Sequence, residues 1–125
     1  MSRSITIRIG DVTVPGELNE SPTASLIWKA LPVEGTANQW GAEIYFAIPV
    51  KAKLDETARD VVERGDLGYW PPGHALCIFF GPTPASRGDE IRPSSPVNLV
   101  GKIGGDLRIF KDAAEGTQVR VEREA

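Results

Sequence analysis

The sequence contains one cysteine and one histidine among its 125 residues. A single cysteine, Cys77, cannot form an internal disulfide, and because it lies in the apolar run of residues 75–80 we expect it in the core rather than at a reactive site. Zinc sites usually combine three or four histidine, cysteine or carboxylate ligands, and His74 is the only other residue of the first two types. We therefore expect no metal centre and no cofactor.

The chain also lacks an excess of positive charge and a long apolar segment. It has 14 Lys and Arg against 17 Asp and Glu, a formal net charge of -3, which gives phosphate backbones no basic surface. No apolar run approaches the roughly 20 residues of a membrane-spanning helix, and residues 1–6 are typical of a strand rather than a signal peptide. These absences predict a cytoplasmic protein without nucleic-acid or membrane partners, and they leave its oligomeric state open.

Glycine and proline, by contrast, are plentiful, with 13 and 10 residues respectively. They divide a chain into short elements joined by tight turns, and this favours strands over helices. A length of 125 residues with 41% hydrophobic residues suits one core, so we expect residues 1–125 to form a single domain.

Alternation of apolar and polar residues predicts at least six strands. Ile44, Phe46 and Ile48 share one face and are expected to fill the core, whereas Glu43 and Tyr45 share the other. A further segment is apolar on both faces and should be covered on both sides. The N-terminal hairpin is expected to break at Pro15-Gly16. The predicted strands are residues 5–9, 12–14, 40–48, 75–80, 97–103 and 118–122.

Helical signals are fewer and shorter. Ser21-Pro22 offers an N-cap and a proline at the first helical position, and Pro32 ends that helix. A second helix is predicted from Asp55 to Gly65, and residues 106–114 can hold a further turn. The result is a mostly β chain with two or three short helices. A closed barrel would remove the strand edges, and a two-sheet sandwich is the alternative architecture.

Candidate functional residues lie around a long loop, residues 81–96, whose Pro, Ser, Gly and charged composition is typical of a functional or surface segment. Glu43 and Tyr45 point away from the predicted core, near Trp70 and the loop arginines Arg87 and Arg92, and together they could form a shallow ligand groove. Simple packing beneath the loop is the alternative interpretation. His74 could act as a general base, but Ser86, Asp89 and His74 lack the spacing of a catalytic triad.

Three blocks of the sequence resemble small prokaryotic cyclophilin-like proteins. They are Asn38-Gln-Trp-Gly-Ala-Glu-Ile-Tyr-Phe46, residues 65–84 (GDLGYWPPGHALCIFFGPTP) and Val97-Asn-Leu-Val-Gly-Lys-Ile103. The resemblance implies a cyclophilin-like closed β-barrel with short helices. True cyclophilins isomerise X-Pro bonds with an arginine in a Phe-His-Arg motif, and this chain has neither that motif nor Phe-x-x-x-Gln-Gly. Prolyl isomerase activity is therefore not carried over by the resemblance, since fold alone does not imply function.

Three hypotheses for function follow from these observations. The leading one is a binding module for a small molecule or peptide. The second is an enzyme, either a weak prolyl isomerase or a lyase or hydrolase acting on a small acid, with Glu43, His74 and an arginine in the catalytic roles. The third, implied by the resemblance, is a non-catalytic subunit of a larger metabolic enzyme. The candidate ligand-binding residues are Glu43, Tyr45, Trp70, His74, Arg87 and Arg92.

Overall fold

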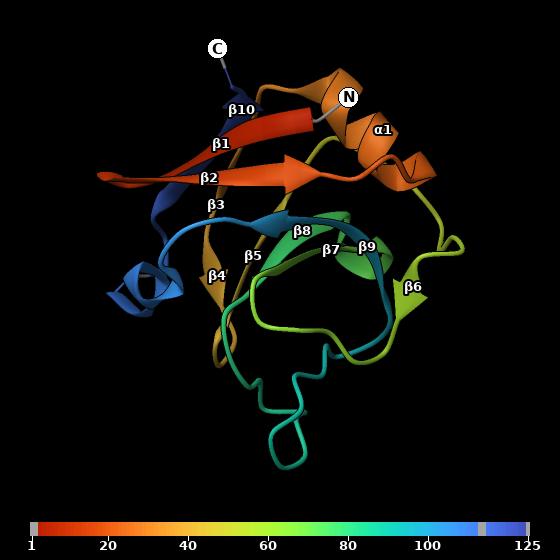
Figure 1. Cartoon of the computed structure of the whole chain (residues 1–125), viewed down its shortest axis with the longest axis vertical. Helices are drawn as coiled ribbons and strands as arrows, with labels where there is room; N and C mark the ends of the chain where they lie inside the picture. The colour runs from red at the N-terminus through yellow and green to blue at the C-terminus, as the bar shows by residue number, and fades with distance from the viewer. Residues whose placement is uncertain (1–2, 113–114, 125) are drawn as a thin grey trace.

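The computed structural model describes residues 3–112 and 115–124, which are mostly strand (Figure 1). One α-helix, α1 (Pro22–Ala30), and two short 3-10 helices, η1 (Pro71–Gly73) and η2 (Leu107–Asp112), complete this part of the chain. The strands are β1 (Arg3–Ile9), β2 (Val12–Leu18), β3 (Val33–Thr36), β4 (Asn38–Gln39), β5 (Glu43–Ala47), β6 (Ala58–Arg59), β7 (Asp66–Trp70), β8 (Ala75–Phe79), β9 (Val97–Ile103) and β10 (Gln118–Arg123).

The strands form one antiparallel sheet in the order β3-β10-β1-β2-β9-β7-β8-β5-β4, with β6 beside β9. Its two end strands, β3 and β4, are consecutive in the chain and are separated only by Ala37. The sheet therefore curls round until its ends meet, and the result is a nearly closed barrel (Figure 1). This confirms the predicted mostly β barrel with short helices rather than the two-sheet sandwich.

The α-helix begins as its sequence predicts. The Ser21 hydroxyl accepts a hydrogen bond from the backbone N–H of Ala24 at 3.3 Å, and Pro22 occupies the first turn, where its missing N–H leaves no bond unmade. Ala24 and Ile27 are fully buried in the main core, so the apolar face of α1 packs against the barrel.

Buried side chains form two clusters on opposite faces of β8. The main core lies on the face of Leu76, Ile78 and Phe80, and it takes in most of the buried aliphatic residues of β1, β5 and β10. A smaller cluster on the other face contains Val62, Cys77, Phe79, Ile91 and Val97, of which Ile91 belongs to the loop of residues 81–96. Both faces of β8 are therefore covered, as its apolar sequence predicted.

Two local predictions are wrong. The predicted helix of residues 55–65 is instead an extended segment containing β6 and a bridge from Val62 to Ile91. The Asp55 carboxylate accepts hydrogen bonds from the backbone N–H and the hydroxyl of Thr57 at 2.7 and 2.6 Å, a local turn that competes with a helix. Its own N–H donates to Asn98 Oδ1 at 2.8 Å, which ties this segment to β9.

The second wrong prediction concerns the hairpin, because β2 runs through Pro15-Gly16 to Leu18 instead of breaking there. Proline is tolerated because β9 pairs with β2 only from Gly16 onward, so no bond between these two strands is lost. The further helical turn expected within residues 106–114 is present as η2. Residues 1–2 and 113–114 lie outside the described residues. No helix in the described ranges is long and apolar enough to span a membrane.

The burial of Cys77 predicts that its thiol is unreactive in the folded protein. The thiol lies in the middle of β8 and is 1% exposed, and burial together with the nearby Glu43 carboxylate raises its pKa well above the usual value. We expect no reaction with an aromatic disulfide reagent in the native state and full reaction after unfolding in guanidinium. Since the sequence has one cysteine, the signal comes from this site alone. Rapid native labelling would show that one face of β8 is accessible.

Candidate functional site

A pocket of about 240 Å³ opens on the outer face of the barrel, beside the loop of residues 81–96. Three aromatic side chains and one carboxyl group form most of its lining, and the loop supplies one wall. The lining residues are Trp40, Glu43, Tyr45, Trp70, Pro93, Ser94 and Val97.

The register of β5 and β8 places Glu43 and Tyr45 in this pocket. Glu43 is paired with Phe79 and Tyr45 with Cys77, so both side chains lie on the sheet face opposite the main core. The two residues share a face, as their alternation with Ile44 predicted. Glu43 is only 6% exposed, so the site is deeper than the shallow groove on an outward face that the sequence predicted.

The buried carboxyl of Glu43 lacks a full set of partners. Its Oε1 atom receives no hydrogen bond from any described residue. Burial raises the pKa of Glu43 to about 7, and the neighbouring Cys77 thiol offsets part of this rise. Removing a carboxylate from water is costly when no cation or donor replaces the water. The group is thus balanced between its neutral and ionised forms near neutral pH, a property that is common at functional sites.

A tight turn holds Trp40 beside Glu43. The two residues exchange backbone hydrogen bonds of 3.0 and 3.2 Å across Gly41 and Ala42. Gly41 has φ +60°, and a Cβ there would lie 2.7 Å from Pro84, so the turn requires glycine on both counts. This glycine turn is the sequence signal that places Trp40 at the pocket, although Trp40 is not among the predicted binding residues.

Trp70 is fixed from two sides. Its indole N–H donates to Ser95 Oγ at 2.6 Å, which ties the ring to the loop. Tyr45 meets it edge to face, with ring centroids 6.3 Å apart and an interplanar angle of 70°. Gly73 lies beneath the ring, where a Cβ would approach it to 2.8 Å. The aromatic wall is therefore held in place by the protein itself, before any ligand enters.

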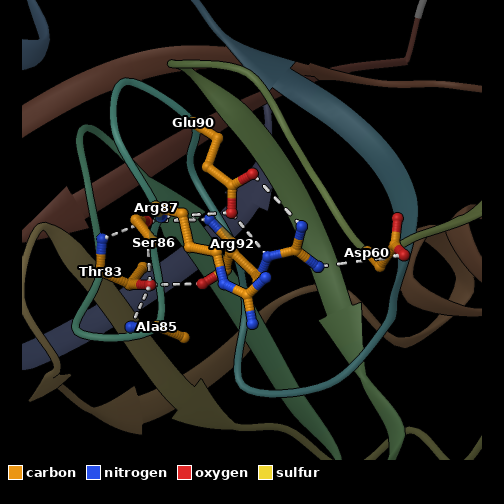
Figure 2. Close-up of polar contacts among 7 residues, drawn as sticks. All are labelled: Asp60, Thr83, Ala85, Ser86, Arg87, Glu90 and Arg92. Carbon is orange, nitrogen blue, oxygen red and sulfur yellow. Dashed lines mark hydrogen bonds and ion pairs between the residues drawn. The ribbon is translucent and has the colours of Figure 1, made fainter.

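The loop arginine Arg92 is held in ion pairs within the protein (Figure 2). Its guanidinium donates to Glu90 through Nε at 2.6 Å and Nη2 at 3.2 Å, and it lies 4.0 Å from Asp60. The Glu90 carboxylate also accepts the backbone N–H of Arg87 at 3.3 Å. Arg92 therefore joins the loop to the segment that contains β6.

Hydroxyl groups brace the same loop from its other side (Figure 2). Ser86 Oγ accepts the backbone N–H groups of Thr83 and Arg92 at 2.9 and 3.0 Å, and the Thr83 hydroxyl donates to the Arg92 carbonyl. Pro93 and Ser94 follow directly, so these bonds set the position of the pocket wall. Loop composition alone gives no sign of this wall.

The structure brings together three of the six predicted binding residues, Glu43, Tyr45 and Trp70. It places His74 elsewhere, exposed at the end of η1 in a left-handed conformation with φ +47°. The side chains of Arg87 and Arg92 also lie outside the pocket lining. Within the ranges that the structure describes, no group of three or more His, Cys, Asp or Glu side chains could hold a metal ion.

Comparison with known proteins agrees with this architecture. The model of the cyclophilin-like family matches residues 3–122. A hypothetical protein from Archaeoglobus fulgidus has a solution structure that is similar with a TM-score of 0.83 and 43% identity, covering 98% of this chain and 95% of the other. No curated protein sequence matches.

A more distant structure, that of McbB in complex with tryptophan, has a TM-score of 0.73 at 18% identity. The match covers 97% of this chain but 45% of McbB, so the chain spans about half the length of that protein, and the likeness is one of fold. With the family model matching nearly all of its length, this chain belongs to the cyclophilin-like family.

Proposed function

We propose that this protein binds a small molecule, or a single side chain of a peptide, in the pocket around Glu43. The observation that carries the proposal is the buried carboxyl of Glu43, whose Oε1 atom has no hydrogen-bond partner among the described residues, on a residue that lines an aromatic space of about 240 Å³. Buried polar groups in native proteins are normally paired, and an exception calls for a partner such as a water, an ion or a ligand. Apolar walls with a few fixed polar groups are the usual composition of a ligand site.

Two further observations support the proposal. The pocket wall is preorganised, since Trp70 is anchored by Ser95 and the loop by the ion pairs of Arg92. McbB, which shares the fold, was solved in complex with tryptophan. Because the likeness is one of fold alone, tryptophan enters as one compound of a test panel, alongside other small amines, acids and X-Pro peptides.

The three tryptophans of the chain allow a direct test by nuclear magnetic resonance. Trp40 and Trp70 line the pocket, whereas Trp28 lies on α1 with the Arg123 guanidinium 4.5 Å from its ring centre. We expect a binding compound to shift the indole N–H signals of Trp40 and Trp70 in a saturable way and to leave Trp28 unchanged. Single Trp→Phe variants assign the three signals.

A pair of variants at Ser94 provides the control. Ser94 lies at the exposed mouth of the pocket, so Ser94→Phe should obstruct entry without disturbing the core, whereas Ser94→Ala leaves the opening free. The proposal requires that Ser94→Phe abolish the shifts and that Ser94→Ala keep them. A panel without any saturable shift at Trp40 and Trp70 would refute it.

A further inference from the structure

We infer that the ligand of this pocket carries a protonated amine or amidine group, which the Glu43 carboxylate binds while the aromatic walls enclose the rest of the molecule. The inference rests on the proposed function and names the chemical class of its ligand. Three features of the pocket lead to it, namely the unpaired acceptor, the aromatic walls and the limited volume.

The first feature is a hydrogen-bond acceptor, the Glu43 carboxylate, with no positively charged side chain in the pocket lining. An ionised carboxylate can only accept hydrogen bonds, and Oε1 of Glu43 receives none from the described residues. The lining contains no lysine, arginine or histidine, and the loop arginine Arg92 is already paired with Glu90 and Asp60. The positive charge that would compensate Glu43 is thus missing from the protein side, and a bound ammonium or amidinium group would supply it through charge-assisted hydrogen bonds.

The aromatic walls favour the same charge. Trp40, Tyr45 and Trp70 line the same pocket as the carboxyl, and the faces of such rings attract a cation that lies within about 6 Å of the ring centre. An anionic ligand would meet repulsion from Glu43 itself. A neutral ligand without an N–H or O–H donor would leave Oε1 unpaired and would gain no hydrogen bond from it.

The volume limits the rest of the ligand. At about 240 Å³ the space is smaller than the roughly 300–1,000 Å³ of sites for drug-sized ligands. It suits a molecule with one ring or one short aliphatic chain next to its amine, or a single basic side chain of a larger partner. A folded peptide segment of several residues does not fit.

Binding of a cation should be linked to the protonation of Glu43. Because the pKa of Glu43 is about 7, the free protein holds the group largely neutral at pH 5.5 and largely ionised at pH 8. A bound ammonium stabilises the carboxylate, so at acidic pH binding releases one proton from Glu43 to solvent, and affinity rises with pH up to about 7. Among the described residues, the other titratable groups beside Glu43 in the pocket lining and on β8 are the Tyr45 phenol and the Cys77 thiol, and the raised pKa of the thiol keeps it neutral in this range.

The test uses three small probes of the same shape and different charge, namely benzylamine, benzyl alcohol and benzoate. Binding is measured by calorimetry and by the indole signals of Trp40 and Trp70, at pH 5.5, 7 and 8, in a buffer free of amines. We expect benzylamine to bind roughly tenfold or more tightly at pH 8 than at pH 5.5, as the change in ionised fraction implies. The other two probes should bind weakly at every pH.

Variants separate the role of Glu43 from that of overall charge. Glu43→Gln should weaken benzylamine binding at least tenfold at pH 8 and remove the pH dependence, whereas Glu20→Gln, at an exposed position, should change neither. The comparison of probes and pH values in the unaltered protein does not depend on the folding of a variant. If neutral or anionic compounds bind as tightly as amines of the same shape, the ligand class is wrong while the pocket remains a binding site. If no compound of the probe set or the wider panel binds, the proposed function fails as well.

Discussion

Phe79→Ala is expected to lower the free energy of unfolding by roughly 3–5 kcal/mol. Phe79 is fully buried in the smaller core cluster, where it packs with Val97 over Gly68. Truncation removes the transfer free energy of the ring and leaves a cavity between β8 and the loop. The loss is a large fraction of the roughly 5–15 kcal/mol that stabilises a domain.

Phe80→Ala should lower the free energy of unfolding by a similar amount, because Phe80 is buried on the opposite face of the same segment. Phe80 points into the main core, where its ring lies 5.8 Å from that of Phe110. Urea denaturation of both variants measures the two costs, and Leu54→Ala serves as the control because Leu54 is 49% exposed. A loss below about 1 kcal/mol in either phenylalanine variant, comparable to that of the exposed control, would contradict the double-sided burial of this segment.

The alternation of residues in β5 and the continuous apolar sequence of β8 made the environment of their faces predictable. A strand places successive side chains on opposite faces, so the assignment of Ile44 and Phe46 to the core needs no knowledge of the partner strand. The covering of both faces of β8 follows in the same way from its continuous apolar sequence. The barrel as a whole was predicted from the number of short strands and from the resemblance of three sequence blocks to the cyclophilin-like family.

The segment after Asp55 was mispredicted because its structure depends on a distant residue. Helical spacing of Ala58, Val61 and Val62 is compatible with a helix, but the Asp55 backbone is held by Asn98, which lies 43 positions away in the sequence. Asn98 is fully buried, and its amide also donates to Thr23 Oγ1 at 2.8 Å. A buried hydrogen-bond network of this kind outweighs local propensity, and a local sequence window does not contain it.

The pocket was partly predictable for a related reason. Alternation places Glu43 and Tyr45 on one face, but the position of Trp70 depends on the pairing of β7 with β8. The wall formed by Pro93 and Ser94 depends on the path of the loop, to which an ion pair of Arg92 with Asp60, 32 residues earlier in the sequence, contributes. Arg92, a predicted binding residue, instead uses its guanidinium in ion pairs with Asp60 and Glu90. Without knowledge of these ion pairs, the sequence does not show that Glu43 lacks a positively charged side chain as its partner.

The buried carboxyl of Glu43 should also make the stability of the protein depend on pH. Glu43 ionises near its ordinary pKa of 4.5 in the unfolded chain and near 7 in the folded protein. Below about pH 4.5 the group is neutral in both states and burial of the charge costs nothing. As pH rises from 4.5 to 7, the unfolded state loses its proton first, so the folded state becomes relatively less stable, by about 3 kcal/mol in total.

Glu43→Gln should abolish this loss, since glutamine does not ionise. Relative to the unaltered protein, the variant is expected to gain about 3 kcal/mol in the free energy of unfolding between pH 4.5 and pH 8. Urea denaturation of both proteins at the two pH values gives this difference, and effects of other groups, such as the lowered pKa of Asp55, cancel because both proteins share them. The buffers must contain no amine, because a bound amine would itself stabilise the carboxylate. A difference between the two proteins that stays constant with pH would mean that Glu43 has a partner for its charge within the protein, and the case for a cationic ligand would then lose its basis.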